Sequence, residues 1–323
     1  MKKGTKIFVI ALILSLPFWW GINNLEKNLS HFLFWYELSK NPKIFIAEIN
    51  PERKLGPIRD KNIENLEIEA KSAISVLLSK NGTEKTLFEK EINQKLPIAS
   101  LTKLMTVFVV LENYDLSKEI KITKEAVNQE GDFGKLEIGR VYTVEYLLYP
   151  LLMESSNDAA FALSNDYQGM NRENFVGLMN QTAERINLEN TYFFNPTGLE
   201  PEEDKLTAQL NYSTVADLVK LTKELLKKPL IWEILSTPAY SLYGPELRNT
   251  NELLWDEALS WRTMIVGGKT GYTEKAGGCI VLVLKTPKNK GYLINIILGT
   301  KDNNERFNEM KRLVEWLNVA YKW

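Results

Sequence analysis

Apolar residues recur along this chain in short runs of strand length and in longer runs of helix length. Residues 73–79 and 86–92 are strand-like, and the Asn-Gly pair between them is typical of a tight hairpin turn. Two later apolar runs, 279–284 and 292–298, have a similar length. The pattern therefore predicts strands near both ends of the globular part of the chain.

Between these strands the pattern is mostly helical, from Tyr114 to about Leu226. Helices are predicted at Thr143–Met153 with a disruption at Pro150, from Ala159 to Leu163, at Glu173–Ile186 and at Thr214–Leu226, where Ser213 or Thr214 is the cap. Asp302 and Glu305 resemble a capping box before a last helix, whose apolar face comprises Phe307, Met310, Leu313, Val314 and Leu317. We predict an α+β fold with an antiparallel sheet built from N- and C-terminal segments, flanking helices and a mostly helical subdomain.

The N-terminal residues have the pattern of a membrane segment. Three lysines, at positions 2, 3 and 6, precede the apolar run 7–22, which is typical of an export signal, and no small-residue cleavage site follows it. Two tryptophans in this run suit a membrane–water interface. We expect a signal-anchor and juxtamembrane segment at 1–40, and a cleaved signal peptide is the alternative.

The rest of the chain is expected to form a linker at 41–70 and one domain at 71–323, with a helical insertion at about 114–226. Because the lysines keep the N-terminus on the cytoplasmic side, this domain is expected outside the cytoplasmic membrane, tethered by the single N-terminal segment. If the signal is cleaved, the domain is secreted.

Composition excludes several classes of function. The chain has 323 residues and a formal net charge of −1, which gives no indication of a nucleic-acid partner. Its single cysteine, Cys279, opens an apolar run and is expected to be a buried, inert thiol. Its single histidine, His31, lies in the N-terminal aromatic segment. A histidine-based triad and a histidine-ligated metal site are therefore excluded, and we expect neither a metal nor a cofactor.

Acid–base chemistry must then come from lysine, carboxylates or tyrosine, and one segment offers it. Leu96–Glu112 is apolar on nearly all sides and predicts a buried helix with Pro97 in its first turn. Ser100 and Lys103 lie three residues apart on one face of that helix. A buried amine must be paired or neutral, and a neutral lysine beside a serine can activate it as a nucleophile. By itself the tetrad also fits a helix cap and a lysine that extends to solvent.

Two further motifs follow in order: Ser155-Ser156-Asn157 at a break between helices, and Lys269-Thr270-Gly271 on a glycine-flanked strand. With them, the chain resembles the penicillin-recognising serine enzymes, and among these the D-alanyl-D-alanine carboxypeptidases of the low-molecular-mass penicillin-binding proteins. The resemblance runs from about Lys71 to the C-terminus. It includes residues 95–106, 130–131, 139, 143–148, 195–199, 212–214, 249–254 and 275–277.

The resemblance implies a β-lactamase/transpeptidase-like fold and a role for each catalytic residue. Ser100 would form the acyl-enzyme, and a neutral Lys103 would take its proton. Ser155 would relay a proton to the leaving amine, with Ser156 as the alternative if the register is shifted by one. Asn157 would hydrogen-bond Lys103 and the substrate amide.

The resemblance also implies how the substrate is held. Lys269 and Thr270 would bind the terminal carboxylate, and the glycines around them, Gly271 among these, would let a peptide approach the strand edge. The backbone N–H groups of Ser100 and Tyr272 would form the oxyanion hole. The implied partners are peptidoglycan pentapeptide as substrate and β-lactams as covalent inhibitors.

Some features differ from the family pattern. Many relatives have a C-terminal β-rich domain and an amphipathic membrane tail, whereas here we expect the N-terminus to provide the anchor. Some relatives have an arginine that helps to hold the substrate carboxylate, where this chain has Thr250. Arg248 or Arg262 could replace that arginine, although we interpret both as ordinary surface charges.

Three alternatives remain open from the sequence. A DD-endopeptidase would use the same residues on cross-linked muropeptides. A class A-like serine β-lactamase is suggested by Glu200-Pro201-Glu202, although Asn195–Leu199 just before it resembles the carboxypeptidases and Glu200 is expected to be a solvated charge. The non-enzymatic alternative is a wall-binding or sensor module.

Overall fold

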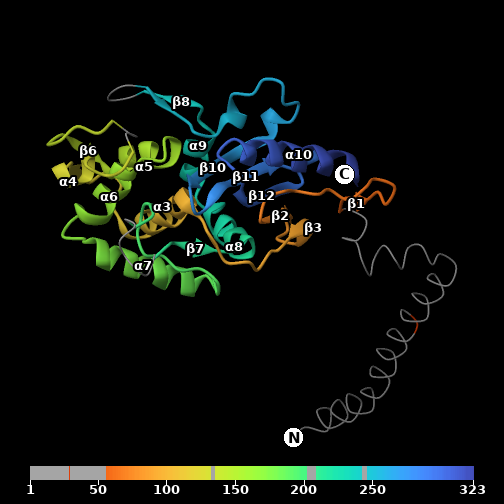
Figure 1. The fold of residues 1–323 in the computed structure, drawn as a ribbon, viewed down its shortest axis with the longest axis horizontal. Helices are drawn as coiled ribbons and strands as arrows, with labels where there is room; N and C mark the ends of the chain where they lie inside the picture. Colours follow the sequence, from red (N-terminus) through yellow and green to blue (C-terminus); the bar gives the residue numbers. More distant parts are fainter. Residues whose placement is uncertain (1–28, 30–55, 132–134, 202–208, 242–245) are drawn as a thin grey trace, which may run out of the picture. The chain divides into compact units, whose positions relative to one another are not determined.

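The fold in Figure 1 is a computed structural model that describes residues 29, 56–131, 135–201, 209–241 and 246–323. The chain divides into two units, a large one of residues 61–320 and a small one of residues 1–60 and 321–323. In the small unit, β1 (Ile58–Arg59) pairs antiparallel with β13 (Tyr321–Lys322). The predicted signal-anchor apart from residue 29, His31 included, and the first half of the predicted linker, residues 41–55, lie outside the described residues. Within the described ranges, no helix is both long enough and apolar enough to cross a bilayer.

The large unit is built on an antiparallel sheet, which has five strands in the order β10-β11-β12-β2-β3 among the described residues. These strands are β2 (Ser72–Ser79), β3 (Glu84–Lys90), β10 (Ile265–Thr273), β11 (Gly277–Lys285) and β12 (Gly291–Thr300). In the centre, β2 from the N-terminal part pairs with β12 from the C-terminal part. The predicted α+β arrangement, with one sheet closed by segments distant in sequence, is confirmed.

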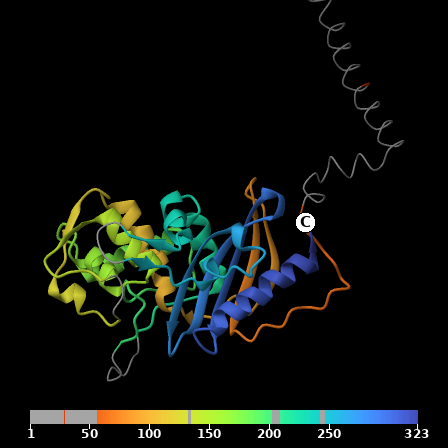
Figure 2. The ribbon, with the colours of Figure 1, turned by 90° about the horizontal axis from the view of Figure 1, so that it is seen from above.

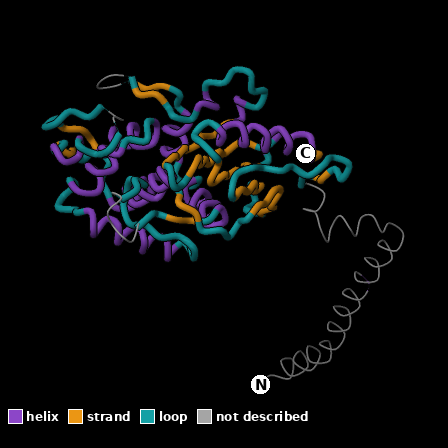
Figure 3. The backbone as a smooth tube through the Cα atoms, viewed as in Figure 1, coloured by secondary structure: helices purple, strands orange, loops and turns teal. Residues whose placement is uncertain are grey.

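Helices cover this sheet and form a second region beside it (Figures 2 and 3). They are α3 (Thr102–Asn113), α4 (Lys124–Val127), α5 (Val144–Met153), α6 (Asn157–Asn165), α7 (Arg172–Arg185), α8 (Val215–Leu225), α9 (Pro229–Ser236) and α10 (Glu305–Ala320). Short strand pairs join their ends: β4 (Leu96–Pro97) with β7 (Tyr212–Ser213), β5 (Glu119–Lys121) with β6 (Val141–Thr143), and β8 (Ala239–Tyr240) with β9 (Leu247–Arg248). Helices α8 and α10 pack on opposite faces of the sheet, and the predicted apolar face of α10 is buried.

Helix α3 is the centre of the helical region, because α5, α6, α7 and α8 all contact it. Every residue from Thr102 to Val110 is buried, so the prediction of a helix that is covered on all sides is confirmed. The short 3₁₀ turn η2 (Ala99–Leu101) directly precedes α3 and contacts the edge strand β10. The start of the helix is thereby placed near that strand.

Two local predictions are wrong, and one helix was not predicted. Pro97 is not in the first turn of the helix but in β4, opposite Tyr212 of β7, and the α-helix begins only at Thr102. Proline fits this short edge pairing because its ring adopts extended backbone and the pairing does not require its N–H. Pro150 does not disrupt α5, which continues to Met153; the neighbouring buried leucines stabilise the helix at that point. The helix α9, which starts at Pro229, is absent from the sequence-based pattern.

Candidate active site

Ser100 and Lys103 face each other at the start of the central helix. Lys103 is fully buried in the first turn of α3, and its Nζ lies 2.9 Å from the Oγ of Ser100 in η2. Ser100 itself is half-buried, so its hydroxyl is reachable while the amine behind it is not. The alternative in which Lys103 extends to solvent is therefore wrong.

Two other contacts of the Lys103 amine are to oxygen atoms that accept hydrogen bonds. Its Nζ lies 2.8 Å from Asn157 Oδ1 and 2.6 Å from the carbonyl oxygen of Thr197. The orientation of the Asn157 amide is fixed, because its Nδ2 donates to the carbonyl of Glu130 at 2.7 Å. A neutral amine has two N–H donors and one lone pair. With both donors used by Asn157 and Thr197, the lone pair is left for the hydroxyl of Ser100.

The electrostatics favour that neutral form. Burial lowers the pKa of Lys103 well below its ordinary value, and the positive charge of Lys269 lowers it further. No carboxylate among the described residues forms an ion pair with Lys103, so no negative charge there holds it in the ammonium form. The site thus contains a lysine that can accept a proton from serine.

The structure distinguishes Ser155 from Ser156. Ser156 is fully buried and caps α6, where its Oγ accepts a hydrogen bond from the backbone N–H of Ala159. Ser155, just before it, has a left-handed backbone with φ of 64°, and its Oγ has no hydrogen-bond partner among the described residues. Strained non-glycine backbone of this kind is concentrated at functional sites. Of the two serines, Ser155 is the one with a hydroxyl available for a proton relay.

Lys269 brings a second buried amine to the site. It is 1% exposed on β10, and its Nζ donates to the carbonyl of Thr270 at 2.9 Å. Burial, and to a lesser extent the charge of Arg306, lower the pKa of Lys269 to about 7. The described carboxylates form no ion pair with Lys269, so the buried cation is ready to bind an anionic ligand.

The edge strand β10 lies directly against the nucleophile turn. A β-carbon at Gly271 would lie only 2.9 Å from the backbone nitrogen of Ser100, so a larger residue would displace one of the two segments. Tyr272, the next residue, is 44% exposed and pairs with Gly278 of β11. The structure therefore places Ser100 and the predicted Gly271–Tyr272 edge side by side, as an oxyanion hole built from Ser100 and Tyr272 would require.

Thr250 connects two of the three motif segments. Its hydroxyl lies 2.7 Å from the hydroxyl of Thr270, and its backbone N–H donates to the carbonyl of Met153 at 2.9 Å, two residues before Ser155. Arg248 also contacts this loop, since its backbone N–H donates to Glu154 Oε1 at 3.0 Å. The side chain of Arg248 is highly exposed and pairs with Glu246, as expected of a surface charge.

Several groups that contact residues of the candidate site were not predicted from the sequence. The carbonyl of Thr197 contacts Lys103, and Arg306 of α10 donates from Nη1 to the carbonyl of Gly271 at 2.9 Å. Glu200 is not merely solvated, because its Oε1 accepts a hydrogen bond from the backbone N–H of Lys275. The segment containing Thr197 belongs to the quoted resemblance, but a backbone acceptor has no side-chain signal in a sequence. Cys279 is fully buried, and burial raises the pKa of its thiol to about 11, in agreement with an inert role.

Comparison with known proteins identifies the family. The family model described as D-alanyl-D-alanine carboxypeptidase matches residues 59–302. This chain belongs to that family of serine peptidases. The predicted resemblance is confirmed, and with it, at the level of the family, the prediction of a serine carboxypeptidase of the hydrolase class.

Named relatives and a solved structure agree with this family. Over 271 residues the chain is 31% identical to D-alanyl-D-alanine carboxypeptidase DacF of Bacillus subtilis. The aligned region covers 81% of this chain and 65% of DacF. Over 254 residues it is 31% identical to a D-alanyl-D-alanine endopeptidase of Pseudomonas aeruginosa. This second aligned region covers 76% of this chain and 77% of the relative. The chain thus spans about two thirds to three quarters of these two proteins.

The solved structure is that of penicillin-binding protein D2 from Listeria monocytogenes in its cefotaxime-bound form. It is 27% identical, has a TM-score of 0.66, and the match covers 79% of this chain and all of that one. The predicted fold is therefore also supported by comparison in three dimensions.

Proposed function

We propose that this protein is a serine D-Ala-D-Ala carboxypeptidase that acts on peptidoglycan stem peptides through an acyl-enzyme on Ser100. The observation that carries the proposal is the set of three contacts of Lys103 Nζ: Ser100 Oγ, Asn157 Oδ1 and the carbonyl of Thr197. Together they leave a neutral amine with its lone pair toward the nucleophile.

Acylation follows from this arrangement. Ser100 Oγ attacks the carbonyl carbon of the penultimate D-alanine, and its proton moves to Lys103 Nζ. The oxyanion is stabilised by backbone N–H groups of Ser100 and Tyr272. The C–N bond then breaks, and the leaving amine of the last D-alanine takes a proton by way of Ser155. A water molecule later attacks the ester, with Lys103 again as the base, and releases the shortened peptide.

Substrate binding uses the edge of β10. The terminal carboxylate pairs with the protonated Lys269 and accepts hydrogen bonds from the hydroxyls of Thr270 and Thr250, which lie together. The substrate's main chain runs along the glycine-containing strand edge as an added strand. β-Lactams would acylate the same serine, in keeping with the antibiotic-bound form of the Listeria relative.

The cellular location is part of the proposal. A domain that cuts peptidoglycan must lie outside the cytoplasmic membrane, and the lysines and apolar run at the N-terminus fit a tether or an export signal. A second candidate activity is endopeptidase cleavage of D-alanyl cross-links, since the Pseudomonas relative is named for it.

Labelling with a fluorescent penicillin tests the proposal. The wild-type protein should form a persistent covalent adduct, and mass spectrometry should locate it on Ser100 and reveal the mature N-terminus. Ser100→Ala should abolish labelling, whereas Cys279→Ala should retain it, because the thiol is buried and has no role in the chemistry. Retained labelling of the Ser100 variant would contradict the mechanism. Rapid turnover of the penicillin would indicate a β-lactamase instead.

A further inference from the structure

Arg306, the second residue of α10, is a buried cation in a place that local interactions do not explain. It is 5% exposed, and burial lowers the pKa of its guanidinium to about 10, so the group stays charged at neutral pH. Among the described residues Arg306 forms no ion pair, and its Nε has no hydrogen-bond partner. The helix dipole also opposes a cation in the first turn of a helix. A charge that is kept against these costs points to a function.

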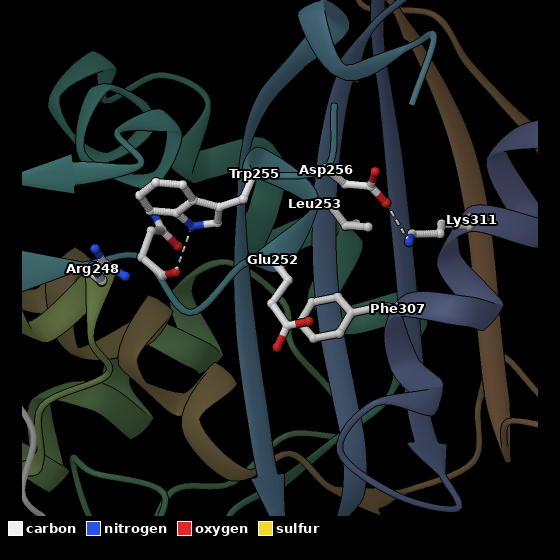
Figure 4. A pocket seen from close by; sticks show the side chains of 8 residues that line it. Arg248, Glu252, Leu253, Trp255, Asp256, Phe307 and Lys311 are labelled. Carbon is white, nitrogen blue, oxygen red and sulfur yellow. Dashed lines mark hydrogen bonds and ion pairs between the residues drawn. The ribbon is translucent and has the colours of Figure 1, made fainter. Parts of the chain in front are cut away.

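The polar contact that the structure describes for this guanidinium is to the strand β10. Its Nη1 donates to the carbonyl oxygen of Gly271 at 2.9 Å, and its carbon atom lies 4.7 Å from the centre of the Phe307 ring. Figure 4 shows Phe307 among the residues that line a pocket with Glu252 and Trp255. Glu252 is exposed, and its charge raises the pKa of Arg306 less than burial lowers it. The hydrogen bond to Gly271 is therefore the contact through which the cation can act.

The carbonyl of Gly271 belongs to the peptide unit whose N–H, that of Tyr272, is the expected oxyanion donor. This peptide bond is trans, so its C=O and N–H groups point in opposite directions. Arg306 holds the C=O from the side of β11, where a β-carbon at Gly278 would lie 3.2 Å from Arg306 Cβ. The N–H of Tyr272 is therefore directed away from β11, toward the edge of β10 that lacks a strand partner among the described residues. Ser100 lies against that strand.

We propose that Arg306 is a positioning residue for the reaction at Ser100, which polarises the Gly271–Tyr272 peptide and strengthens the Tyr272 N–H as a donor to the oxyanion. The inference rests on the proposed function. When Ser100 Oγ bonds to the substrate carbonyl carbon, the π electron pair of that C=O moves onto its oxygen, and it returns when the C–N bond breaks. Hydrogen bonds in a chain polarise one another, and a charged donor makes a stronger bond than a neutral one. The guanidinium, the peptide and the oxyanion form such a chain.

Infrared spectroscopy of the penicillin acyl-enzyme on the full chain tests this role, because the ester carbonyl formed on Ser100 lies in the oxyanion hole. An isotope label in the β-lactam carbonyl identifies its stretch. Arg306→Gln keeps an amide donor but removes the charge, so the weaker hydrogen bond should move the stretch to higher wavenumber. Loss of a whole oxyanion donor costs about 10²- to 10³-fold, so acylation should slow less, about tenfold. Lys301→Gln, which removes an exposed charge before α10, is the control and should change neither.

A second variant, Arg306→Lys, keeps a positive charge that can donate to the same carbonyl. It should keep the ester stretch near the wild-type value and recover most of the acylation rate lost in Arg306→Gln. Urea unfolding establishes that each variant is folded. A folded Arg306→Lys whose stretch moves to higher wavenumber would contradict the proposal, even where Arg306→Gln fails to fold.

The spectroscopic readout separates this role from the other effects of Arg306. The guanidinium also lowers the pKa of Lys269 and connects α10 to β10, so a slower reaction alone does not establish polarisation of the peptide. If acylation slows in Arg306→Gln while the stretch stays at the wild-type value, Arg306 acts through Lys269 or through stability, and the inference is wrong. That result would leave the carboxypeptidase standing. If penicillin does not label Ser100 in the wild-type protein, the proposed function itself fails.

Discussion

Asn157 presents its amide oxygen to Lys103 at 2.8 Å, and its amide nitrogen is held by the carbonyl of Glu130 at 2.7 Å. Because the amide oxygen is an uncharged acceptor, Lys103 can remain neutral. A carboxylate in the same place would stabilise its ammonium form. The contact thus links the choice of asparagine at position 157 to the protonation state of an amine 54 residues earlier in the chain.

Replacing Asn157 by aspartate should therefore disable the base at neutral pH. In Asn157→Asp the new carboxylate stabilises the ammonium form and raises the pKa of Lys103. Because general-base catalysis contributes about 10²- to 10⁴-fold, the acylation rate with penicillin should fall about 100-fold or more near pH 7 and recover as the pH rises. Asn174→Asp, which adds the same charge at an exposed position in α7, is the control. An unchanged pH profile in Asn157→Asp would show that Lys103 is not the base.

The second prediction concerns the pH dependence of substrate binding. The pKa of Lys269 is about 7 in the free protein, so it is charged below that pH and neutral above it. Binding of a terminal carboxylate requires the charged form, and kcat/KM for a pentapeptide should therefore decline as the pH rises through about 7. A pentapeptide with an amidated C-terminus has no carboxylate and should lack this decline. The same alkaline decline for both peptides would contradict a carboxylate-binding role for Lys269.

The third prediction concerns the paired hydroxyls. Thr250→Val keeps the shape of the side chain but removes the group that lies 2.7 Å from the Thr270 hydroxyl. Loss of a charge-assisted hydrogen bond to the substrate carboxylate should raise KM for the pentapeptide by roughly tenfold to 100-fold with little change in kcat. Thr263→Val, at an exposed position of the 3₁₀ turn η4 (Arg262–Met264), should change neither constant. A loss confined to kcat would mean that Thr250 acts on the chemical step instead.

The fourth prediction concerns stability near the nucleophile. Gly198 has φ of +85°, and a β-carbon there would lie 2.1 Å from the carbonyl oxygen of Ala99. Gly198→Ala should therefore lower the free energy of unfolding by at least about 2 kcal/mol and slow acylation, because Ala99 and Ser100 must shift. Gly177→Ala in α7 meets no atom within 4 Å and should stabilise the protein by about 0.5 to 1 kcal/mol. Urea unfolding of the two variants measures both effects, and equal stability of the two would refute the proposed clash.

Much of the fold was predictable because its signals are local. The hairpin of β2 and β3 follows from two apolar runs around Asn81-Gly82, and the buried face of α10 follows from its period. Local signals failed where tertiary contacts compete with them. Pro97 favours a helix start by itself, but pairing of β4 with β7 places it in a strand, and burial keeps α5 helical through Pro150.

The sequence by itself determined the residues of the site and their order, since a serine, a lysine and a glycine-flanked lysine strand are chemical identities that folding does not change. Only the tertiary structure decided how these residues are arranged. The Thr250–Thr270 contact and the acceptor at Thr197 join segments that are remote in the chain. The choice of Ser155 over Ser156 depends on the folded backbone at Ser155 and on the cap that Ser156 provides for α6. The protonation of Lys103 belongs with them, because burial and the charge of Lys269 set its pKa, and both exist only once the chain has folded.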